Sequence, residues 1–223
     1  MLISLHLPKT AGTSFGDSLR LHYGERLLED YDDRPLNRSR LSRRAHAVRL
    51  AARSSGAVRR ALGPVDCIHG HFLPLKYRPL QRDASVRFVT WLRDPLERLA
   101  SHYHYWMREF DEQQAGALHR QVVEEQWSFE RFCLSPQLRN CYSEFLWGFA
   151  PSRFDFIGIT ERYSEDMARF GRDVLGESLP TQSSNVNPDA PRRSYFEDEA
   201  LRRRVADYHA RDVALYQRVL NSH

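Results

Sequence analysis

Four short, mostly apolar segments alternate along this chain with longer stretches of helical periodicity. The segments span 1–7, 65–69, 86–92 and 154–160. Runs of this length and composition are typical of strands buried on both faces of a parallel sheet. Because parallel strands are joined by crossover connections that usually contain a helix, the alternation predicts an α/β fold with three layers: a central parallel sheet flanked by helices.

The length of the chain favours one domain. Its 223 residues can bury one good core and are few for two, and the sequence shows no internal repeat and no linker. We therefore expect a single domain over residues 1–223.

Three helices stand out in the pattern. Asp94 can cap a helix that has Pro95 in its first turn and an apolar face that extends to Phe110. A second helix is expected from about residue 13 to 28, and a third from about 197 to 220. The segment 34–60 is expected to be helical with a break near Ser54, and 181–193 is expected to be a long loop.

The charge of the chain argues against non-specific binding of nucleic acid. It has 33 basic and 29 acidic residues, and Lys9 and Lys76 are the only lysines. Arginine suits phosphate, sulfate and carboxylate groups because its planar guanidinium can bind two oxygens at once. The segment 34–60 contains nine arginines and no acidic residue. It is either a solvated basic helix or one wall of a cleft for an anionic polysaccharide.

The cysteines and the hydropathy of the chain indicate the cellular compartment in which we expect the protein. Cys67, Cys133 and Cys141 are odd in number and lack metal-ligand spacing, which favours buried thiols without disulfides and predicts no metal. No apolar run approaches the 18 residues of a membrane span, and Met1 begins a strand-like segment rather than a signal peptide. We expect a cytoplasmic protein.

A polar turn joins the first apolar segment to the helix that follows it. Backbone amides and the dipole of a helix N-terminus favour an anion, Lys9 adds a positive charge, and Thr10, Thr13 and Ser14 add hydroxyl donors. Unlike the nucleotide P-loop, this turn places its lysine before Gly12, so it should hold a smaller anionic group. The alternative is an ordinary strand-to-helix turn with a surface lysine.

Arg93 follows the third apolar segment, and Ser101 comes eight residues later. On a helix the two lie about 12 Å apart along the axis. An arginine at the carboxyl end of a strand can bind phosphate with both arms of its guanidinium, and Ser101 can donate a further bond. The alternative is that Arg93 pairs with Asp94 or Glu97 and that Ser101 is merely exposed.

Together these segments resemble the sulfotransferase family. HLPKTAGTSF (His6–Phe15) is similar to its 5'-phosphosulfate-binding motif, and VTWLRDPLERLASHYHY (Val89–Tyr105) is similar to its 3'-phosphate-binding motif. HGHF at 69–72, NCYSEFLWG at 140–148 and FIGITERY at 156–163 are weaker similarities in the same order. The resemblance is to the carbohydrate branch, which includes heparan sulfate 2-O-sulfotransferases and related bacterial enzymes. It implies a P-loop-like α/β fold and the donor 3'-phosphoadenosine 5'-phosphosulfate (PAPS).

The resemblance also implies a set of site residues. Those that would hold the 5'-phosphosulfate are Lys9, Thr10, Ala11, Gly12, Thr13 and Ser14. Arg93 and Ser101 would hold the 3'-phosphate, and Asn140 would orient the acceptor or the cofactor. The segment 185–193 falls where the family often closes a loop over the cofactor, without a residue-by-residue match.

Catalysis would use Lys9 at the leaving phosphate and a histidine as the base for the acceptor hydroxyl. His71 is the first choice for that base and His69 the second, because the family places a catalytic histidine in this segment. A glutamate is the alternative if His71 points away from the site.

The expected function is therefore in-line transfer of a sulfuryl group from PAPS to an acceptor hydroxyl. The acceptor would be an oligo- or polysaccharide, with the hydroxyl of a lipid or natural product as the alternative. The product would be adenosine 3',5'-bisphosphate, and no metal would be needed. The family's Golgi members carry a membrane anchor and stem, and their lack in this sequence is typical of a soluble enzyme of the bacterial type. The alternatives are a P-loop small-molecule kinase that uses ATP and magnesium, and a non-catalytic nucleotide- or glycan-binding module.

Overall fold

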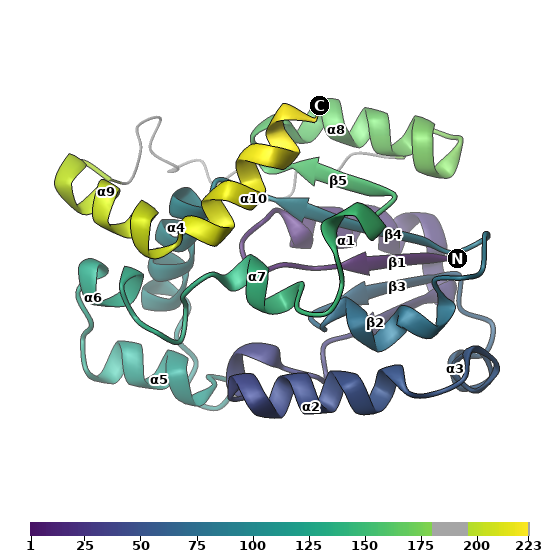
Figure 1. The fold of residues 1–223 in the computed structure, drawn as a ribbon, viewed down its shortest axis with the longest axis horizontal. Coiled ribbons are helices and arrows are strands. Elements are labelled where there is room, and N and C mark those ends of the chain that lie inside the picture. Colours follow the sequence, from purple (N-terminus) through teal and green to yellow (C-terminus); the bar gives the residue numbers. More distant parts are fainter. Residues whose placement is uncertain (180–195, 223) are drawn as a thin grey trace. The chain divides into compact units, whose positions relative to one another are not determined.

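Five parallel strands form one sheet in the order β2-β3-β1-β4-β5 (Figure 1). The strands are β1 (Leu2–Leu5), β2 (Leu27–Asp30), β3 (Cys67–Gly70), β4 (Arg87–Leu92) and β5 (Phe156–Ile159). The structure is a computed structural model and describes residues 1–179 and 196–222. Its all-parallel sheet with flanking helices confirms the predicted α/β fold class.

The middle strand, β1, is the point at which the strand order reverses. Ser4 of β1 lies opposite His69 of β3 on one side and Val89 of β4 on the other. The chain runs from β3 to β4 across β1, so the carboxyl ends of these three strands meet at one edge of the sheet. Ligands of open α/β sheets bind outside the carboxyl ends of the strands at such a point.

Two helices, α1 (Gly12–Tyr23) and α8 (Tyr163–Phe170), cover one face of the sheet. Phe15 of α1 and Phe170 of α8 belong to a buried apolar cluster with Leu2, Val89 and Trp91. On the other face Phe88, the neighbour of Val89 in sequence, packs its ring 4.9 Å from that of Phe149. Side chains of alternate residues thus fill both faces, as in a fully buried parallel sheet.

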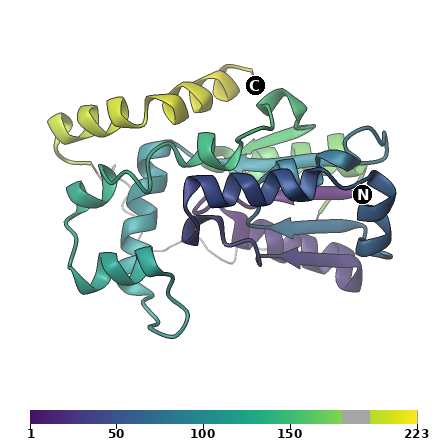
Figure 2. The same cartoon turned by 60° about the horizontal axis from the view of Figure 1, so that its bottom comes forward.

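The arginine-rich segment forms two helices, α2 (Arg40–Ala51) and α3 (Ser55–Leu62), capped by Ser39 and Ser54. The predicted break near Ser54 is confirmed. Helix α2 packs through Ala47 on Leu73 and Leu75 at the start of η3 (Pro74–Leu80), and it comes forward, in dark blue, in Figure 2. The other short elements around the sheet are η1 (Gly24–Arg26), η2 (Pro35–Asn37), η4 (Pro151–Arg153), η5 (Thr160–Arg162) and η6 (Gly171–Leu175).

The chain divides into two compact units. Among the described residues, the unit just presented comprises 1–92 and 145–179, and the second comprises 93–144 and 196–222. The helices of the second are α4 (Pro95–Arg108), α5 (Ala117–Glu124), α6 (Phe129–Cys133), α7 (Cys141–Phe145), α9 (Glu199–Tyr208) and α10 (Ala210–Asn221). Helix α4 begins as predicted, because the Asp94 carboxylate accepts hydrogen bonds from the amides of Leu96 and Glu97.

Two predicted helices are corrected by the structure. The helix expected over 13–28 ends at Tyr23, because Gly24 turns the chain with a positive φ of 54°, and Leu27–Asp30 forms the unpredicted strand β2. The helix expected over 197–220 is two helices that meet at His209. The predicted loop 181–193, with the segment 185–193, lies outside the described residues.

Within residues 1–179 and 196–222, no helix combines the length and the apolar composition that spanning a bilayer requires.

Candidate active site

The turn after β1 has an unusual backbone. Lys9 and Ala11 both adopt left-handed conformations, with φ of 63° and 61°. Such conformations cost energy for residues with a side chain and concentrate at functional sites. The hydroxyl of Thr10, between them, donates to the carbonyl of Leu7 at 2.9 Å. The turn is therefore held in a defined shape and brings Lys9 to the start of α1.

The first turn of α1 has the chemistry of an anion site. The amide of Phe15 makes the first bond along the helix, to the carbonyl of Ala11 at 3.0 Å. The amides of residues 12–14 come before that bond, and such amides have no partner within a helix. No acidic residue lies in this first turn. The helix dipole and the donor amides thus favour a negative group beside Lys9.

Gly12 is required by the side chain of His6. A Cβ atom at position 12 would lie 1.9 Å from Cδ2 of His6, far inside van der Waals contact. The ring of His6 therefore lies against the backbone of the first residue of α1. Only glycine allows this approach, and His6 in turn supports the start of the helix.

His69 fastens the same helix start to β3. Its Nε2–H donates to the carbonyl of Gly12 at 3.1 Å, and its Nδ1 accepts from the hydroxyl of Ser4 at 2.8 Å. The ring is 1% exposed. Burial, together with the neighbouring His71, lowers the pKa of His69 to about 3, so the ring is neutral at physiological pH. Both nitrogens of His69 are thus engaged within the fold.

Within residues 1–179 and 196–222, His71 differs from His69 in having one ring nitrogen, Nε2, without a hydrogen bond. Its Nδ1–H donates to the carbonyl oxygen of His6 in a short hydrogen bond. This bond fixes the tautomer, so that the lone pair is on Nε2. Burial lowers the pKa of His71, which keeps the ring neutral and able to accept a proton at neutral pH. The half-buried ring lies 4.3 Å from that of His6, between centroids.

Tyr31, which directly follows β2, completes this group. Its hydroxyl shares a hydrogen bond of 2.9 Å with Nδ1 of His6, and its ring meets that of His71 edge to face at 5.0 Å. Burial raises the pKa of Tyr31 to about 12. His6, His69, His71 and Tyr31 therefore form a packed set of neutral rings around the turn that carries Lys9.

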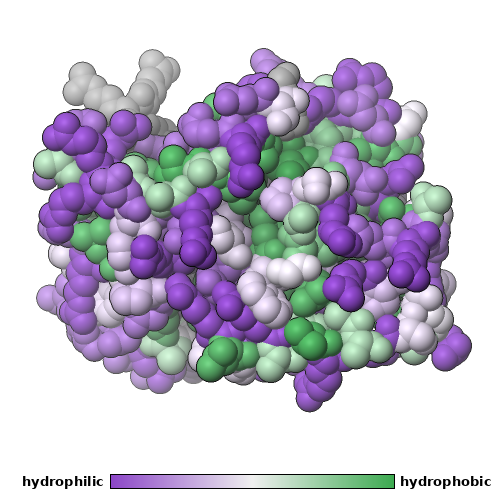
Figure 3. Space-filling view, viewed as in Figure 1, coloured by the Kyte–Doolittle hydropathy of each residue, from purple (hydrophilic) through white to green (hydrophobic). Residues whose placement is uncertain are grey.

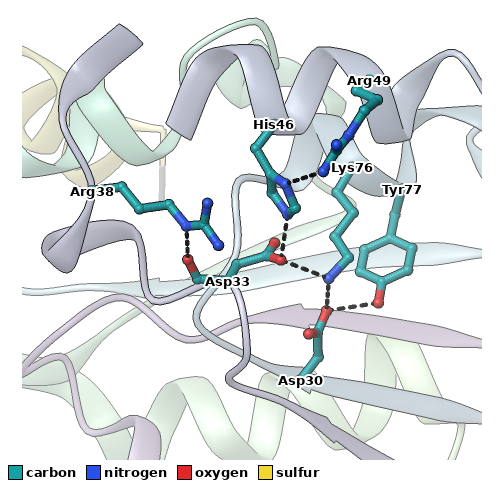
Figure 4. Close-up of polar contacts among 7 residues, drawn as sticks. All are labelled: Asp30, Asp33, Arg38, His46, Arg49, Lys76 and Tyr77. Carbon is teal, nitrogen blue, oxygen red and sulfur yellow. Dashed lines mark hydrogen bonds and ion pairs between the residues drawn. The ribbon is translucent and has the colours of Figure 1, made fainter. Parts of the chain in front are cut away.

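A second polar cluster fixes the chain on both sides of Tyr31 (Figure 4). Asp30 accepts hydrogen bonds from Nζ of Lys76 and from the Tyr77 hydroxyl, both at 2.7 Å. Lys76 also donates to Asp33 at 3.2 Å. The amine of Lys76 is thus held between two buried carboxylates, and Lys9 is the lysine that lies beside the helix N-terminus.

The same cluster reaches α2 through a histidine. Nε2–H of His46 donates to Asp33 at 2.9 Å, while its Nδ1 accepts from Arg49 at 3.1 Å, as Figure 4 shows. Nε of Arg38 donates to the carbonyl of Asp33 at 2.7 Å. The arginine-rich helix is therefore anchored to the carboxyl end of β2, next to the histidine group.

Arg93 and Ser101 belong to the second unit. Arg93 directly follows β4, and the hydroxyl of Tyr142 bonds both its backbone amide and its carbonyl. Among residues 93–144 and 196–222, no hydrogen bond or ion pair engages the Arg93 guanidinium. Ser101, on α4, is half-buried. The guanidinium and the hydroxyl are donors suited to a phosphate.

Asn140 comes directly before α7 with a left-handed φ of 53°. Its backbone amide donates to Nδ1 of His209 at 3.1 Å. Its side-chain Oδ1 is buried and has no hydrogen-bond partner within the described part of the chain. A buried, unpaired acceptor of this kind suits a hydroxyl or amine donor of a ligand.

Sequence reasoning does not identify Tyr31 or Tyr142. Tyr31 is hidden because the strand before it is not recognised, and Tyr142 because its partners are about 50 and 70 residues away in the chain. No local pattern marks either residue.

The described residues include no group of three or more His, Cys, Asp and Glu side chains that could hold a metal ion. Although His6, His69 and His71 lie close together, four of their six ring nitrogens are already engaged in hydrogen bonds: both nitrogens of His69, and Nδ1 of His6 and of His71.

Comparison with known proteins gives a likeness in structure and none in sequence. No family model matches the sequence, and no curated protein matches it. Among solved structures, the chain is similar to a sulfotransferase from Alicyclobacillus acidocaldarius, with 16% sequence identity and a TM-score of 0.48. The match covers 99% of this chain and 95% of that one. The assignment of the fold rests on the strand order and register described above.

Proposed function

We propose that this protein is a sulfotransferase that moves the sulfuryl group of PAPS to a hydroxyl of a carbohydrate acceptor. The observation that carries the proposal is the pairing of β1 with β4. The two strands are parallel neighbours, with Leu5 opposite Thr90, so the chain leaves the same edge of the sheet into both nucleotide-binding motifs. Each motif begins where α/β sheets bind ligands.

The donor groups at these two places suit the two anionic ends of PAPS. The β1–α1 turn offers helix amides, Lys9 and no acidic residue in the first turn. Arg93 and Ser101 offer a guanidinium and a hydroxyl for the 3'-phosphate. When bound, PAPS supplies the sulfuryl group and a phosphate leaving group.

Lys9 has the electrostatic role in this account. Negative charge grows on the phosphate oxygens as the bond to sulfur breaks, and a cation held beside them stabilises that charge more in the transition state than in the ground state. The left-handed backbone at residues 9 and 11 fixes where the side chain of Lys9 starts. His69, through Gly12, is a positioning residue for the helix amides.

His71 is the proposed general base. Its Nε2 accepts the proton of the acceptor hydroxyl, while Nδ1–H stays bonded to the carbonyl of His6 and holds the ring in place. This choice over His69 follows from the hydrogen bonds, because both nitrogens of His69 are engaged.

A carbohydrate acceptor is proposed from the surface beside this site. Arg40 and Arg53 are exposed, and Arg44 stacks over the ring of Trp147 at 4.9 Å. Leu41 and Val48 of α2 are 80% and 50% exposed. Figure 3 shows hydrophobic side chains among hydrophilic ones at the lower edge, where α2 lies. Exposed arginines suit an anionic polysaccharide, because their guanidinium groups pair with sulfate and carboxylate. Asn140 would orient the acceptor or the nucleotide.

Calorimetry with adenosine 3',5'-bisphosphate, and separately with ATP and magnesium, tests the proposal. We expect the bisphosphate to bind and ATP with magnesium to bind weakly or not at all. Transfer of labelled sulfate from PAPS to a panel of oligosaccharides then tests the reaction. Preference for ATP and magnesium would indicate a kinase, and binding of the bisphosphate without transfer to any acceptor would indicate a binding module.

A further inference from the structure

One tyrosine hydroxyl holds both backbone groups of Arg93. The Arg93 amide donates to the hydroxyl oxygen of Tyr142 at 3.1 Å, and the Tyr142 hydroxyl donates to the Arg93 carbonyl at 2.7 Å. Arg93 stands between the end of β4 and the N-cap residue Asp94, outside any strand or helix. Its backbone therefore depends on Tyr142 for the hydrogen bonds that a regular element would supply.

Tyr142 is itself held by the last helix. Its amide donates to Oδ2 of Asp212 at 2.8 Å, and the amide and hydroxyl of Ser143 both donate to Oδ1 of Asp212, at 3.0 and 2.9 Å. Asp212 is 1% exposed and Tyr142 is 0% exposed. A carboxylate with both oxygens engaged by two successive residues fixes the direction of the backbone there.

A histidine repeats this arrangement one turn earlier. His209 accepts from the Asn140 amide through Nδ1 and donates from Nε2 to the Cys133 carbonyl at 2.8 Å. The guanidinium of Arg98 lies over the ring of Tyr142, 5.7 Å from its centre. The tyrosine is thus fixed at its backbone and faced by a cation at its ring.

From this chain of contacts we propose that Tyr142, held by Asp212, is a positioning residue that fixes Arg93 for recognition of the 3'-phosphate. The inference rests on the proposed function, since it assigns the role of residues behind a proposed PAPS ligand. A bidentate bond between guanidinium and phosphate depends on the origin and direction of the side chain, and both are set by the backbone that Tyr142 holds.

The test compares the affinity for adenosine 3',5'-bisphosphate with that for adenosine 5'-monophosphate, which lacks the 3'-phosphate. The dissociation constant for the monophosphate divided by that for the bisphosphate measures what the 3'-phosphate contributes to binding. In Tyr142→Phe the ring stays and both backbone bonds to the hydroxyl are lost. Because the Arg93 backbone then lacks the two hydrogen bonds that hold it, we expect the ratio to fall roughly tenfold or more, with the affinity for the monophosphate unchanged.

Tyr103→Phe is the matched control. The Tyr103 hydroxyl, on α4, donates to the carbonyl of Trp127 at 3.0 Å, so its loss also removes a hydrogen bond from a tyrosine to the backbone. This variant should lower the unfolding temperature without changing the ratio. Asp212→Asn is a second test, because a side-chain amide has one acceptor oxygen where the carboxylate has two. This variant should also lower the ratio, as Tyr142→Phe does.

The outcomes separate the inference from the function on which it rests. A wild-type preference for the bisphosphate that survives intact in Tyr142→Phe would overturn the positioning role alone. An equal fall of the ratio in Tyr103→Phe would overturn it too, because the effect would then be one of general stability. If the wild-type protein shows no preference for the 3'-phosphate, the proposed function and this inference both fall.

Discussion

His69 joins β3 to the first residue of α1, because its Nε2–H donates to the carbonyl oxygen of Gly12 at 3.1 Å. The other nitrogen accepts from Ser4 of β1 at 2.8 Å. One neutral imidazole therefore ties two strands to the helix N-terminus at which we propose that the phosphosulfate binds. This bond pattern can exist only while His69 is unprotonated, which makes the stability of the site depend on pH.

The first prediction is that acid destabilises the protein in part through His69. An unfolded histidine binds a proton near pH 6.5, whereas burial lowers the pKa of His69 to about 3 in the folded state. Between these values the unfolded state binds more protons, so the free energy of unfolding falls as the pH falls, by up to about 1.4 kcal/mol per pH unit for this group.

His69→Gln isolates that contribution, since glutamine can donate to Gly12 and does not titrate in this range. Urea unfolding at pH 7.5, 5.5 and 4.5 should show a shallower decline in the variant than in the wild-type protein. Parallel declines in the two proteins would contradict the assignment of a neutral, buried His69.

The second prediction concerns Gly12. A methyl group there would approach Cδ2 of His6 to 1.9 Å, so Gly12→Ala must displace either the ring or the helix start. We expect a loss of about 1–3 kcal/mol in the free energy of unfolding, as for other overpacked sites, and a loss of binding to adenosine 3',5'-bisphosphate. Denaturant unfolding and calorimetry measure the two effects.

Gly56→Ala is the control for Gly12→Ala. Gly56 lies in α3, and the nearest atom to an added Cβ is Nη1 of Arg60 at 3.5 Å, an ordinary contact. Alanine favours a helix over glycine, so this variant should be as stable as the wild-type protein or more stable by about 0.5 kcal/mol, with unchanged binding. Normal binding by Gly12→Ala would show that the helix start is not held as described.

The third prediction concerns the proposed base. His71→Gln should lower kcat by about 10²- to 10⁴-fold while leaving the affinity for adenosine 3',5'-bisphosphate unchanged within about twofold. Burial lowers the pKa of His71, so the wild-type rate should be constant near neutral pH and should fall only in acid, below pH 6.5. His22→Ala, on α1, is the control, because His22 lies outside the histidine group.

Measured turnover and the pH–rate profile together decide this prediction. If His71→Gln keeps full activity, or if its acid limb stays at the wild-type pH, another group removes the proton from the acceptor.

The sequence alone predicts those elements that depend on residues close together in the chain. The cap at Asp94 and the helix after it follow from residues within a few positions of each other, and so does the turn from β1 into α1. Strand β2 is missed because Leu27 and Leu28 continue the apolar spacing of α1, and only the three residues of η1 separate the two elements. The break at His209 depends on contacts with Cys133 and Asn140, which no local pattern reveals.

The hydrogen bonds that distinguish the two candidate histidines also depend on tertiary structure. His69 lies on β3, two residues after Cys67. Its side chain therefore points to the same face of the sheet as that of Cys67, the face covered by α1, whereas His71 lies beyond the end of the strand. Which of them keeps an open nitrogen depends on Gly12, Ser4 and His6, residues 57 to 65 positions away. A single sequence contains no signal for that difference.

The central claim is that one nucleotide is held at its 5' end by the β1–α1 turn and at its 3' end by Arg93. Calorimetry of the wild-type protein, Lys9→Ala and Arg93→Ala with adenosine 3',5'-bisphosphate, adenosine 5'-monophosphate and adenosine 3'-monophosphate tests it most directly. We predict that Arg93→Ala weakens the two ligands with a 3'-phosphate roughly tenfold or more and spares the 5'-monophosphate, and that Lys9→Ala weakens the two with a 5'-phosphate and spares the 3'-monophosphate. Equal losses for all three ligands in either variant, or no binding to the wild-type protein, would contradict the claim.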